Sequence, residues 1–304
     1  MELRQLRYLV ALADERHFTR AAERVRVAQP ALSQQVAKLE RELGQPLVDR
    51  TTRRVHLTEA GELLVAHARR VLAELDDARA ELEQLSGLLG GRVTIGLTQT
   101  PGPLDLVRLL ADFHACHSHV ELAVREDLST TLADELRADA LDLAFLSIVE
   151  DADRRGLELQ ELAAEPLVVA LPAAHRLAGR ARLTIGDLRE EELIAFSEGA
   201  TIRRAVRRIA REAGFEPRIA FETREVARMR ALVAAGLGVA ILPRSDAQAP
   251  GPPVRIAALR PPTLTHRISL CWRHGKRHAP AARALLEQTR AMYIAGGHRS
   301  SKKA

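Results

Sequence analysis

The sequence predicts an α/β protein that begins with an all-α winged helix-turn-helix, and three observations support this fold class. Residues 1–57 carry apolar side chains at helical spacing, followed by a short basic turn. Residues 58–88 read as one long amphipathic helix. Over residues 89–296, short apolar strands alternate with helices, the order that gives sheets joined by helical crossovers. A chain of 304 residues is long enough for several domains.

Three helices and two short strands are expected at the N-terminus. The apolar periodicity predicts helices over residues 2–15, from Phe18 to Val25 and from Pro30 onward. Proline fits the first turn of a helix because its missing N–H would have no partner there, and Gly44 is expected to end the third helix. Leu47 to Leu57 would form the two strands of a wing.

The exposed polar side chains of the third helix are expected to read DNA. Glutamine can make a bidentate pair with adenine and serine can contact several base edges, so Gln29, Ser33 and Gln34 are assigned to bases. Wing arginines suit phosphate or minor-groove contacts, whereas Thr19 and Pro30 would shape helix ends. The full predicted interface is Thr19, Gln29, Pro30, Ser33, Gln34, Gln35, Lys38, Arg50, Arg53 and Arg54. The alternative is a polar helix face that contacts only solvent.

The helix over residues 58–88 is expected to pair two copies of the chain. Its apolar residues recur at spacings of four and three, as in a coiled coil. This heptad seam consists of Leu64, Ala68, Val71, Leu75, Ala78, Leu82 and Leu85. About 29 residues would make a helix of roughly 43 Å. The alternative is a helix that packs only on its own domain.

The charge of the chain is distributed unevenly. Residues 1–57 hold 11 basic and 7 acidic residues, a net charge of +4, whereas residues 58–88 hold 3 basic and 7 acidic residues, a net charge of −4. A basic head followed by an acidic spacer fits a nucleic-acid-binding end. Two cysteines without CxxC spacing argue against a secreted disulfide scaffold. With no signal-peptide pattern and no apolar run of roughly 20 residues, we expect a cytoplasmic protein without membrane contact.

The region after the long helix is expected to form two lobes. The predicted strands are residues 92–97, 121–126, 141–146, 167–171, 193–196, 219–222, 239–242 and 267–272. Because helices lie between most of them, we expect mainly parallel sheets. Ser86 to Gly91 would be a hinge-like break. Residues 91–161 with 266–296 would form lobe 1, residues 162–265 would form lobe 2, and residues 297–304 would be a disordered tail.

Polar residues follow several of these strands and precede helices. Open α/β sheets bind ligands beyond the carboxyl ends of their strands. Hydroxyls and free N–H groups at a helix N-terminus favour a carboxylate or another anion. The residues expected to bind a small effector are Thr98, Gln99, Thr100, Ser129, Thr130, Thr201, Ile202 and Thr223. Ordinary helix capping by serine and threonine is the alternative.

An ordered series of residues in the N-terminal region forms a family signature. It runs through Phe18 to Ala22, Gln29 to Ser33, Leu39-Glu40, Leu43-Gly44, Pro46-Leu47, Arg50, Leu57-Thr58, Ala60 and Gly61. Weaker matches follow at Leu171-Pro172, His175 to Leu177, Leu188, Leu232 to Val239 and Leu242-Pro243. The chain thereby resembles the LysR-type transcriptional regulators.

The resemblance implies a winged helix-turn-helix, a dimerising linker helix and a two-lobed, periplasmic-binding-protein-like domain. Members usually assemble as tetramers and respond to a small-molecule co-inducer. A two-fold dimer implies an interrupted palindrome in double-stranded DNA. The expected mechanism is that an effector between the lobes changes how dimers pair, and thereby the access of RNA polymerase.

Three positions depart from the family pattern. Val48 stands where the family usually has phenylalanine, Gln34 where arginine is frequent, and Ala28 where serine is frequent. Val48 is expected to alter packing under the wing, and Gln34 to alter base or phosphate contacts. A consensus family operator is therefore not assumed.

Other sequence features do not favour another function. The spacing HxCHxH, formed by His114, Cys116, His117 and His119, lies near the end of a predicted helix, so no metal is expected. Cys116 and Cys271 lie far apart in sequence, which argues against a thiol switch. With no GxSxG, P-loop or HExxH motif, neither an enzyme nor a cofactor is expected. A solute-binding or enzyme-like protein and an architectural DNA-binding protein without an effector are the alternatives.

Overall fold

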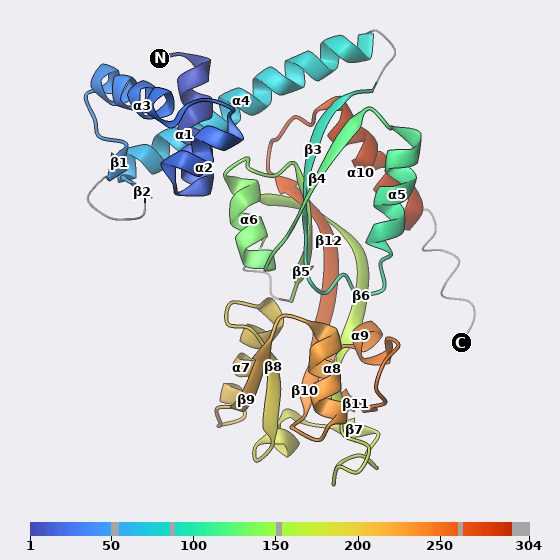
Figure 1. Cartoon of the computed structure of the whole chain (residues 1–304). Helices are drawn as coiled ribbons and strands as arrows, with labels where there is room; N and C mark the ends of the chain where they lie inside the picture. Colours follow the sequence, from blue (N-terminus) through green and yellow to red (C-terminus); the bar gives the residue numbers. More distant parts are fainter. Residues whose placement is uncertain (50–54, 86–88, 150–153, 261–263, 294–304) are drawn as a thin grey trace. The chain divides into compact units, whose positions relative to one another are not determined.

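The computed structural model describes residues 1–49, 55–85, 89–149, 154–260 and 264–293, and it divides into two compact units (Figure 1). The first unit comprises Met1–Gly91, and the second comprises the chain from Arg92 onward apart from Ala138–Ala140. The predicted wing tip from Arg50 to Arg54, residues 86–88 of the predicted hinge and the tail at 297–304 lie outside the described residues.

The first unit has the predicted helix-turn-helix with a two-stranded wing. Its elements are α1 (Leu3–Glu15), α2 (Phe18–Arg24), α3 (Gln29–Leu43), β1 (Val48–Asp49), β2 (His56–Leu57) and α4 (Glu59–Leu85). Leu9, Leu12, Leu32 and Leu39 are fully buried between the helices. Gly44 ends α3 with φ of +68°, the left-handed conformation that favours glycine, as predicted.

The start of α4 is fixed to the wing. The Thr58 hydroxyl accepts the N–H of Gly61 at 3.0 Å and donates to the carbonyl of Pro46 at 2.7 Å. A Cβ on Gly61 would lie 2.1 Å from the Leu47 carbonyl oxygen, so only glycine permits this approach.

The first turns of α4 pack on their own unit. Val65 and Ala68 are buried, and Arg69 pairs with Asp14 of α1 at 2.5 Å. Further along the heptad seam, Val71 is 47% exposed. Packing on its own domain therefore explains the apolar residues in the first turns of α4. It does not explain later positions of the heptad seam such as Val71, which is exposed to solvent. The side chains of Leu82 and Leu85 lie outside the described residues.

The second unit contains two lobes joined by two long strands (Figure 1). Lobe 1 contains β3 (Gly91–Leu97), α5 (Leu106–Cys116), β4 (Val120–Glu126), α6 (Ser129–Arg137), β5 (Leu143–Ile148) and α10 (Pro280–Tyr293). Lobe 2 contains β7 (Arg182–Leu183), the 3-10 helix η2 (Ile185–Leu188), β8 (Glu192–Phe196), α7 (Thr201–Glu212), β9 (Arg218–Thr223), α8 (Val226–Ala234), β10 (Ala240–Pro243), α9 (Arg244–Gln248) and β11 (Arg255–Leu259). The joining strands are β6 (Leu157–Leu171) and β12 (Thr265–Arg273).

The expectation of mainly parallel sheets was wrong. The larger sheet has the order β4-β3-β5-β12-β6-β11-β7, with β10 also paired to β6. Strand β12 is antiparallel to β5 and β6, and β6 is antiparallel to β10 and β11. The pairs β3–β5, β7–β11 and β8–β9 are parallel, and Leu193 and Val239 form a further parallel bridge, so the sheets are mixed. The two strands that join the lobes run antiparallel to each other. The alternation of strands and helices along the sequence does not reveal this direction.

The sequence located only the end of β6 and missed β7 and β11. The first part of β6, LELQELAAE, is mostly half-buried or exposed, whereas Leu167–Leu171 is fully buried and gives the apolar run that was recognised. That buried run forms the core of lobe 2 together with α7, α8 and β8. None of the described helices is long and apolar enough to cross a membrane.

Candidate functional sites

Helix α3 presents a polar face opposite its buried residues. Leu32, Val36 and Leu39 face the core. Among the predicted DNA contacts, Gln29, Pro30, Gln34 and Lys38 are exposed, whereas Ser33 and Gln35 are half-buried. At 100° per residue, Gln34 lies almost opposite the buried face. It is therefore the predicted base reader that protrudes most directly.

Two of the predicted DNA contacts form hydrogen bonds with residues near the start of the chain. The Lys38 ammonium lies 3.0 Å from a carboxylate oxygen of Glu2, and this hydrogen bond lowers the pKa of Glu2. The Gln5 amide donates to Gln35 at 3.4 Å. Lys38 and Gln35 are thus positioned by α1 and its N-cap.

The remaining predicted DNA contacts fall into three groups. Thr19 is exposed at the start of α2, where its N–H donates to the His17 ring at 3.2 Å, so His17 is the capping side chain. Pro30 occupies the first turn of α3, as expected. The wing arginines Arg50, Arg53 and Arg54 lie outside the described residues.

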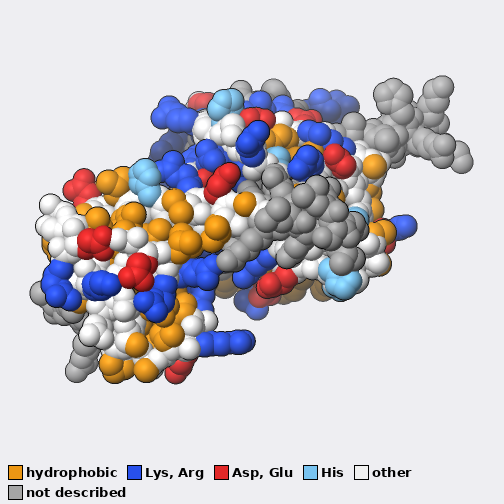
Figure 2. Space-filling model, turned by 90° about the horizontal axis from the view of Figure 1, so that it is seen from above, with side chains coloured by type: hydrophobic (Ala, Val, Ile, Leu, Met, Phe, Trp, Pro, Cys, Tyr) orange, Lys and Arg blue, Asp and Glu red, His pale blue; other side chains and the backbone are white. Residues whose placement is uncertain are grey.

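One exposed cation on the same face was missed. Arg41 follows Gln34 by seven residues, which is two helical turns, and its Nε donates to the Ala37 carbonyl at 3.3 Å. Figure 2 shows basic and acidic side chains interspersed over the face in view, without one large basic field.

A small cavity lies between the two lobes of the second unit. Its lining residues are Thr98, Gln99, Thr100, Asp127, Leu128, Ser129, Ser147, Phe196, Ala200, Thr201 and Ile202. Its volume is about 20 Å³, room for about one water molecule. Six predicted effector residues thus lie together, three of them from the single turn after β3.

Two predicted effector residues do not line this cavity. Thr130 contributes instead to a neighbouring hollow of about 200 Å³ beside α6 and β5. Thr223 is buried, and its hydroxyl accepts the N–H of Glu225 at 3.1 Å, just before α8. The Thr223 hydroxyl thus satisfies a backbone donor in the turn before α8, although the N-cap residue of that helix is Glu225.

A chain of hydroxyl groups crosses the cavity from one lobe to the other. The Ser147 N–H donates to Ser129 Oγ at 2.9 Å, and the Ser129 hydroxyl donates to Thr98 Oγ1 at 3.1 Å. Since Thr98 accepts that bond, its own hydroxyl hydrogen is available to a ligand. The hydroxyl oxygens of Ser147 and Thr201 lie 3.2 Å apart and join lobe 1 to lobe 2.

Sequence reasoning missed Ser147 although a signal was present. Ser147 is the single polar residue of the otherwise apolar and fully buried strand β5. A hydroxyl in such a strand needs a hydrogen-bond partner, and here the partner is Thr201.

Hydrogen-bond donors rather than cations face this cavity. The lining contains no Lys, Arg or His, and its one charged residue is Asp127, which accepts the N–H of Leu128 at 2.8 Å. Helices α6 and α7 begin at the lining residues Ser129 and Thr201, so the partial positive charge of two helix N-termini lies there. The arrangement suits a small polar molecule that accepts hydrogen bonds.

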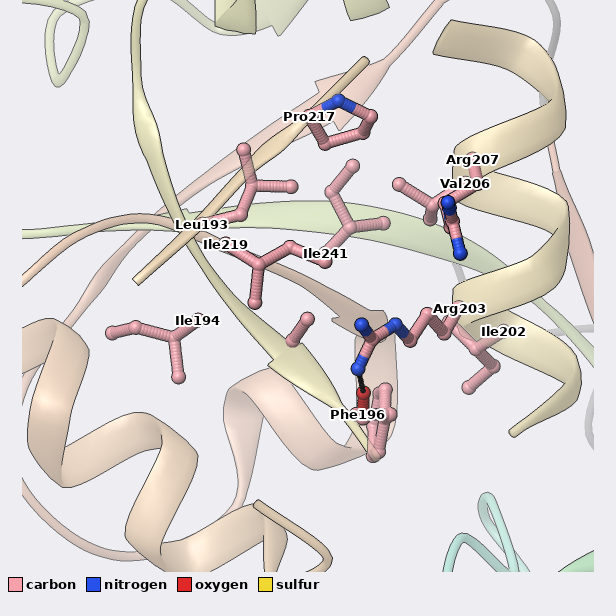
Figure 3. Close-up of a pocket in the computed structure, with 11 residues that line it drawn as sticks. Leu193, Ile194, Phe196, Ile202, Arg203, Val206, Arg207, Pro217, Ile219 and Ile241 are labelled. Carbon is pink, nitrogen blue, oxygen red and sulfur yellow. Dashed lines mark hydrogen bonds between the residues drawn. The ribbon is translucent and has the colours of Figure 1, made fainter. Parts of the chain in front are cut away.

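Arg203 attaches α7 to β8 within lobe 2, beside a second, apolar pocket (Figure 3). Its side chain is 10% exposed, and its Nη1 donates to the Phe196 carbonyl at 3.0 Å and pairs with Glu222 at 2.6 Å. The first turn of α7 is thereby attached to the end of β8. The apolar crevice beside Arg203 has a volume of about 20 Å³, too small for an organic ligand.

The cysteines and the HxCHxH segment do not converge on a site. Cys116 is exposed on α5, and Cys271 is buried on β12, where burial raises the pKa of its thiol. The His117 ring packs against Phe113, with 4.8 Å between ring centroids. In the part of the chain that the structure describes, no three His, Cys, Asp or Glu side chains are arranged to hold a metal ion.

Comparisons with known proteins cover both units. Residues 3–62 match the bacterial regulatory helix-turn-helix of the LysR family, and residues 86–293 match the LysR substrate binding domain. The chain is 36% identical to the DNA-binding transcriptional dual regulator OxyR of Escherichia coli over 80% of this chain and 79% of that protein. It is 33% identical to the HTH-type transcriptional regulator BudR of Raoultella terrigena over 94% and 99%, respectively.

Solved structures agree over nearly the whole chain. A full-length OxyR variant from Pseudomonas aeruginosa has a TM-score of 0.70 at 29% identity and covers 95% of each chain. Full-length CbnR complexed with its target DNA has a TM-score of 0.63 at 27% identity and covers 96% of this chain and 99% of that one. The protein belongs to the LysR family: it is a DNA-binding transcriptional regulator with an effector-binding domain, and not an enzyme.

Proposed function

We propose that the protein reads an interrupted palindrome through paired α3 helices and that a small effector in the inter-lobe cavity controls transcription. The observation that supports this most is the hydrogen bond between Ser147 of lobe 1 and Thr201 of lobe 2. An effector that competes for these hydroxyls changes the spacing of the lobes. It can shift an equilibrium only through different affinities for the two arrangements.

The proposed DNA surface is centred on Gln34. Gln29, Pro30 and Ser33 lie beside it at the start of α3, Gln35 and Lys38 follow, and Thr19 lies on α2. Arg50, Arg53 and Arg54 are proposed phosphate or minor-groove contacts because an arginine-rich wing suits the DNA backbone.

Gln34→Ala tests the DNA surface. Loss of a bidentate contact costs about 1–3 kcal/mol for the correct base, roughly a 5- to 150-fold loss of affinity. The measurement is a footprint on DNA upstream of the protein's own gene, with Gln248→Ala, exposed on α9, as the control. Equal protection by both variants at moderate salt would rule out base reading by Gln34.

The proposed effector is a small carboxylate or another acceptor-rich molecule. Thr98, Gln99, Thr100 and Ser129 would hold it from lobe 1, with Thr201 and Ile202 from lobe 2. Because the cavity has room for about one water, a larger effector binds only when the lobes separate. Thr130 would act indirectly, through α6, whereas no role in effector binding is proposed for Thr223, which does not line the cavity.

Binding of a carboxylate panel tests this site. Acetate, pyruvate and benzoate would be titrated into the full-length protein by calorimetry, with Thr201→Val and Thr223→Val as a matched pair, because both residues are buried but only Thr201 lines the cavity. A compound that binds wild type and Thr223→Val but not Thr201→Val supports the site. A compound that binds both variants equally contradicts it.

The chain is not proposed to sense peroxide through a thiol. Relatives from Dickeya chrysanthemi and Pectobacterium carotovorum are named hydrogen peroxide-inducible genes activators. Oxidation by peroxide requires a thiolate, and burial disfavours the thiolate of Cys271. Cys116 lies on a different element, 155 residues earlier in the sequence.

The proposed assembly is a dimer through α4 that pairs into a homotetramer. The apolar groove on α4 is lined by Leu3, Val71, Leu75 and Ala78, with Arg70 and Glu74 at its border. In the second unit, Val107, Val124 and Phe221 are also exposed. We propose residues 1–57 as the DNA-binding domain and residues 58–88 as the dimerising helix. The effector domain would be residues 89–296, and RNA polymerase would be the final partner, in the cytoplasm.

A further inference from the structure

A cluster of buried and half-buried ionisable side chains lies where the joining strands enter lobe 2. Glu165 belongs to β6 and His266 to β12, while Asp246 comes from α9 and Arg230 from α8. His266 is fully buried and the Glu165 side chain is 10% exposed. None of these residues lines the effector cavity.

Glu165 connects three parts of the second unit. Its carboxylate accepts the N–H and the hydroxyl of Ser245, each at 2.6 Å, which attaches α9 to β6. The His266 Nδ1 lies 3.8 Å from the same carboxylate. A Cβ added to Gly102 would lie 3.1 Å from a Glu165 oxygen, so the loop after β3 also packs here.

His266 extends this connection to the effector cavity. Its Nε2 lies 3.4 Å from the hydroxyl of Thr100, a residue that lines the cavity. The contacts therefore run from Thr100 through His266 and Glu165 to Ser245. They link the turn that would hold the effector to a helix of the opposite lobe.

Asp246 is half-buried and carries one buried carboxylate oxygen, Oδ2, that has no hydrogen-bond partner among the described residues. The charged groups that face it are Glu165 from β6 and Arg230 from α8. Arg230 donates instead to the carbonyls of Pro250 and Pro252, at 2.9 and 3.3 Å.

The pKa values of Asp246 and Glu165 are shifted in opposite directions. Burial and the charge of Glu165 raise the pKa of Asp246 to about 7. Burial also acts to raise the pKa of Glu165, but the neighbouring His266 ring and the hydrogen bonds from Ser245 outweigh it and lower that pKa. Below about pH 7 the pair therefore holds one proton, mainly on Asp246.

We propose that this cluster is a proton-operated joint between the lobes. A proton on Asp246 favours the packed arrangement of α9 on β6 and of the Thr100 turn on His266. Loss of the proton places a second negative charge beside Glu165, which is relieved when α9 moves away and water enters. Only the consequence for effector binding rests on the proposed function of the cavity.

The direction of the pH effect follows from linkage. The packed state raises the pKa of Asp246 from 3.8 to about 7, so it binds the proton more tightly than an opened, solvated state. The packed state is fully favoured below pH 3.8 and loses this advantage as pH rises to about 7 and beyond. Between pH 6 and pH 8 the ratio of opened to packed molecules should rise about tenfold.

Amide hydrogen exchange of the full-length protein tests the joint without any effector. Protection of residues 98–104 and 240–248 would be measured at pH 6 and pH 8, corrected for the intrinsic exchange rate. We expect protection in both segments to fall about tenfold in wild type and to stay at its pH 6 level in Asp246→Asn. Residues 106–116 of α5 should show no such change in either protein.

Two further variants make every outcome decisive. Asp112→Asn, an exposed acid on α5, should behave like wild type. If Asp246→Asn does not fold, Glu165→Gln replaces it, because removing the neighbouring charge lets Asp246 ionise at lower pH and shrinks the change between pH 6 and pH 8. Constant protection in wild type, or an unchanged fall in the folded variant, would overturn the joint whether or not the cavity binds an effector.

Discussion

The DNA-reading face of α3 and the effector cavity are built in different ways. The exposed side chains of α3 come from one continuous segment of 15 residues, held by apolar residues of the same helix. The cavity draws on five separate segments around Thr98, Asp127, Ser147, Phe196 and Thr201. A local surface depends on one helix and its small core, whereas an assembled site depends on the topology of the whole unit.

Removing a core side chain of the first unit should have the largest effect. Leu39→Ala creates a cavity under α3 and should lower the free energy of unfolding of this unit by about 2–5 kcal/mol. Leu39 is fully buried, whereas Leu63 is 64% exposed, so Leu63→Ala is the matched control, with an expected change below about 0.5 kcal/mol. Calorimetry should show only the transition of the first unit shifted. A shift of both transitions would mean that the two units do not unfold independently.

The second unit should be sensitive to loss of a buried ion pair that does not line the cavity. Lys276, 6% exposed, lies 2.9 Å from Asp142, which also accepts the N–H and hydroxyl of Thr94. Asp142→Asn removes the carboxylate that neutralises the buried lysine, which keeps its hydrogen bond to the Leu141 carbonyl, and should cost about 3 kcal/mol in urea unfolding.

The same ion pair predicts a pH dependence. Burial acts to raise the pKa of Asp142, but the charge of Lys276 and the hydrogen bonds from Thr94 outweigh it and lower that pKa. Its stabilising contribution is therefore fully present above pH 3.8 and is lost as pH falls below that value. The gap between wild type and Asp142→Asn should narrow below pH 3.8, and a gap that widens there would contradict this account.

A smaller effect is expected at Arg203, which attaches α7 to β8. Arg203→Ala removes the bond to the Phe196 carbonyl and the pair with Glu222, and should cost about 1–2 kcal/mol because Glu222 is 47% exposed. Arg208→Ala, on the same helix at 48% side-chain exposure, should cost less than about 0.5 kcal/mol. Equal losses in urea unfolding would show that burial does not distinguish these arginines.

The sequence predicts the local surface of α3 better than it predicts the cavity, which is assembled from separate segments. Helical periodicity located α3, and the burial of Leu32, Val36 and Leu39 leaves Gln34 exposed, as that periodicity predicts. Strand ends identified Thr98 and Thr201. The partner of Thr201 could not be predicted, because Ser147 reaches it only through a sheet in which β6 and β12 are antiparallel.

Thr223 shows the limit of reasoning from strand ends. It lies at the end of a strand much as Thr98 does, but its hydroxyl accepts the N–H of Glu225 in the turn before α8 instead of lining the cavity. Sequence position is the same in both cases, and only the three-dimensional neighbours differ. Arg41 was missed for the opposite reason, since its exposure follows from periodicity alone.

The most direct test of the account is a footprint of the full-length protein on its upstream DNA, with and without a carboxylate that binds it. The account predicts that the compound changes the footprint of wild type and of Thr223→Val but not of Thr201→Val, while all three protect the same DNA without it. A compound that binds at the cavity yet leaves the wild-type footprint unchanged would contradict the claim that this cavity controls DNA binding.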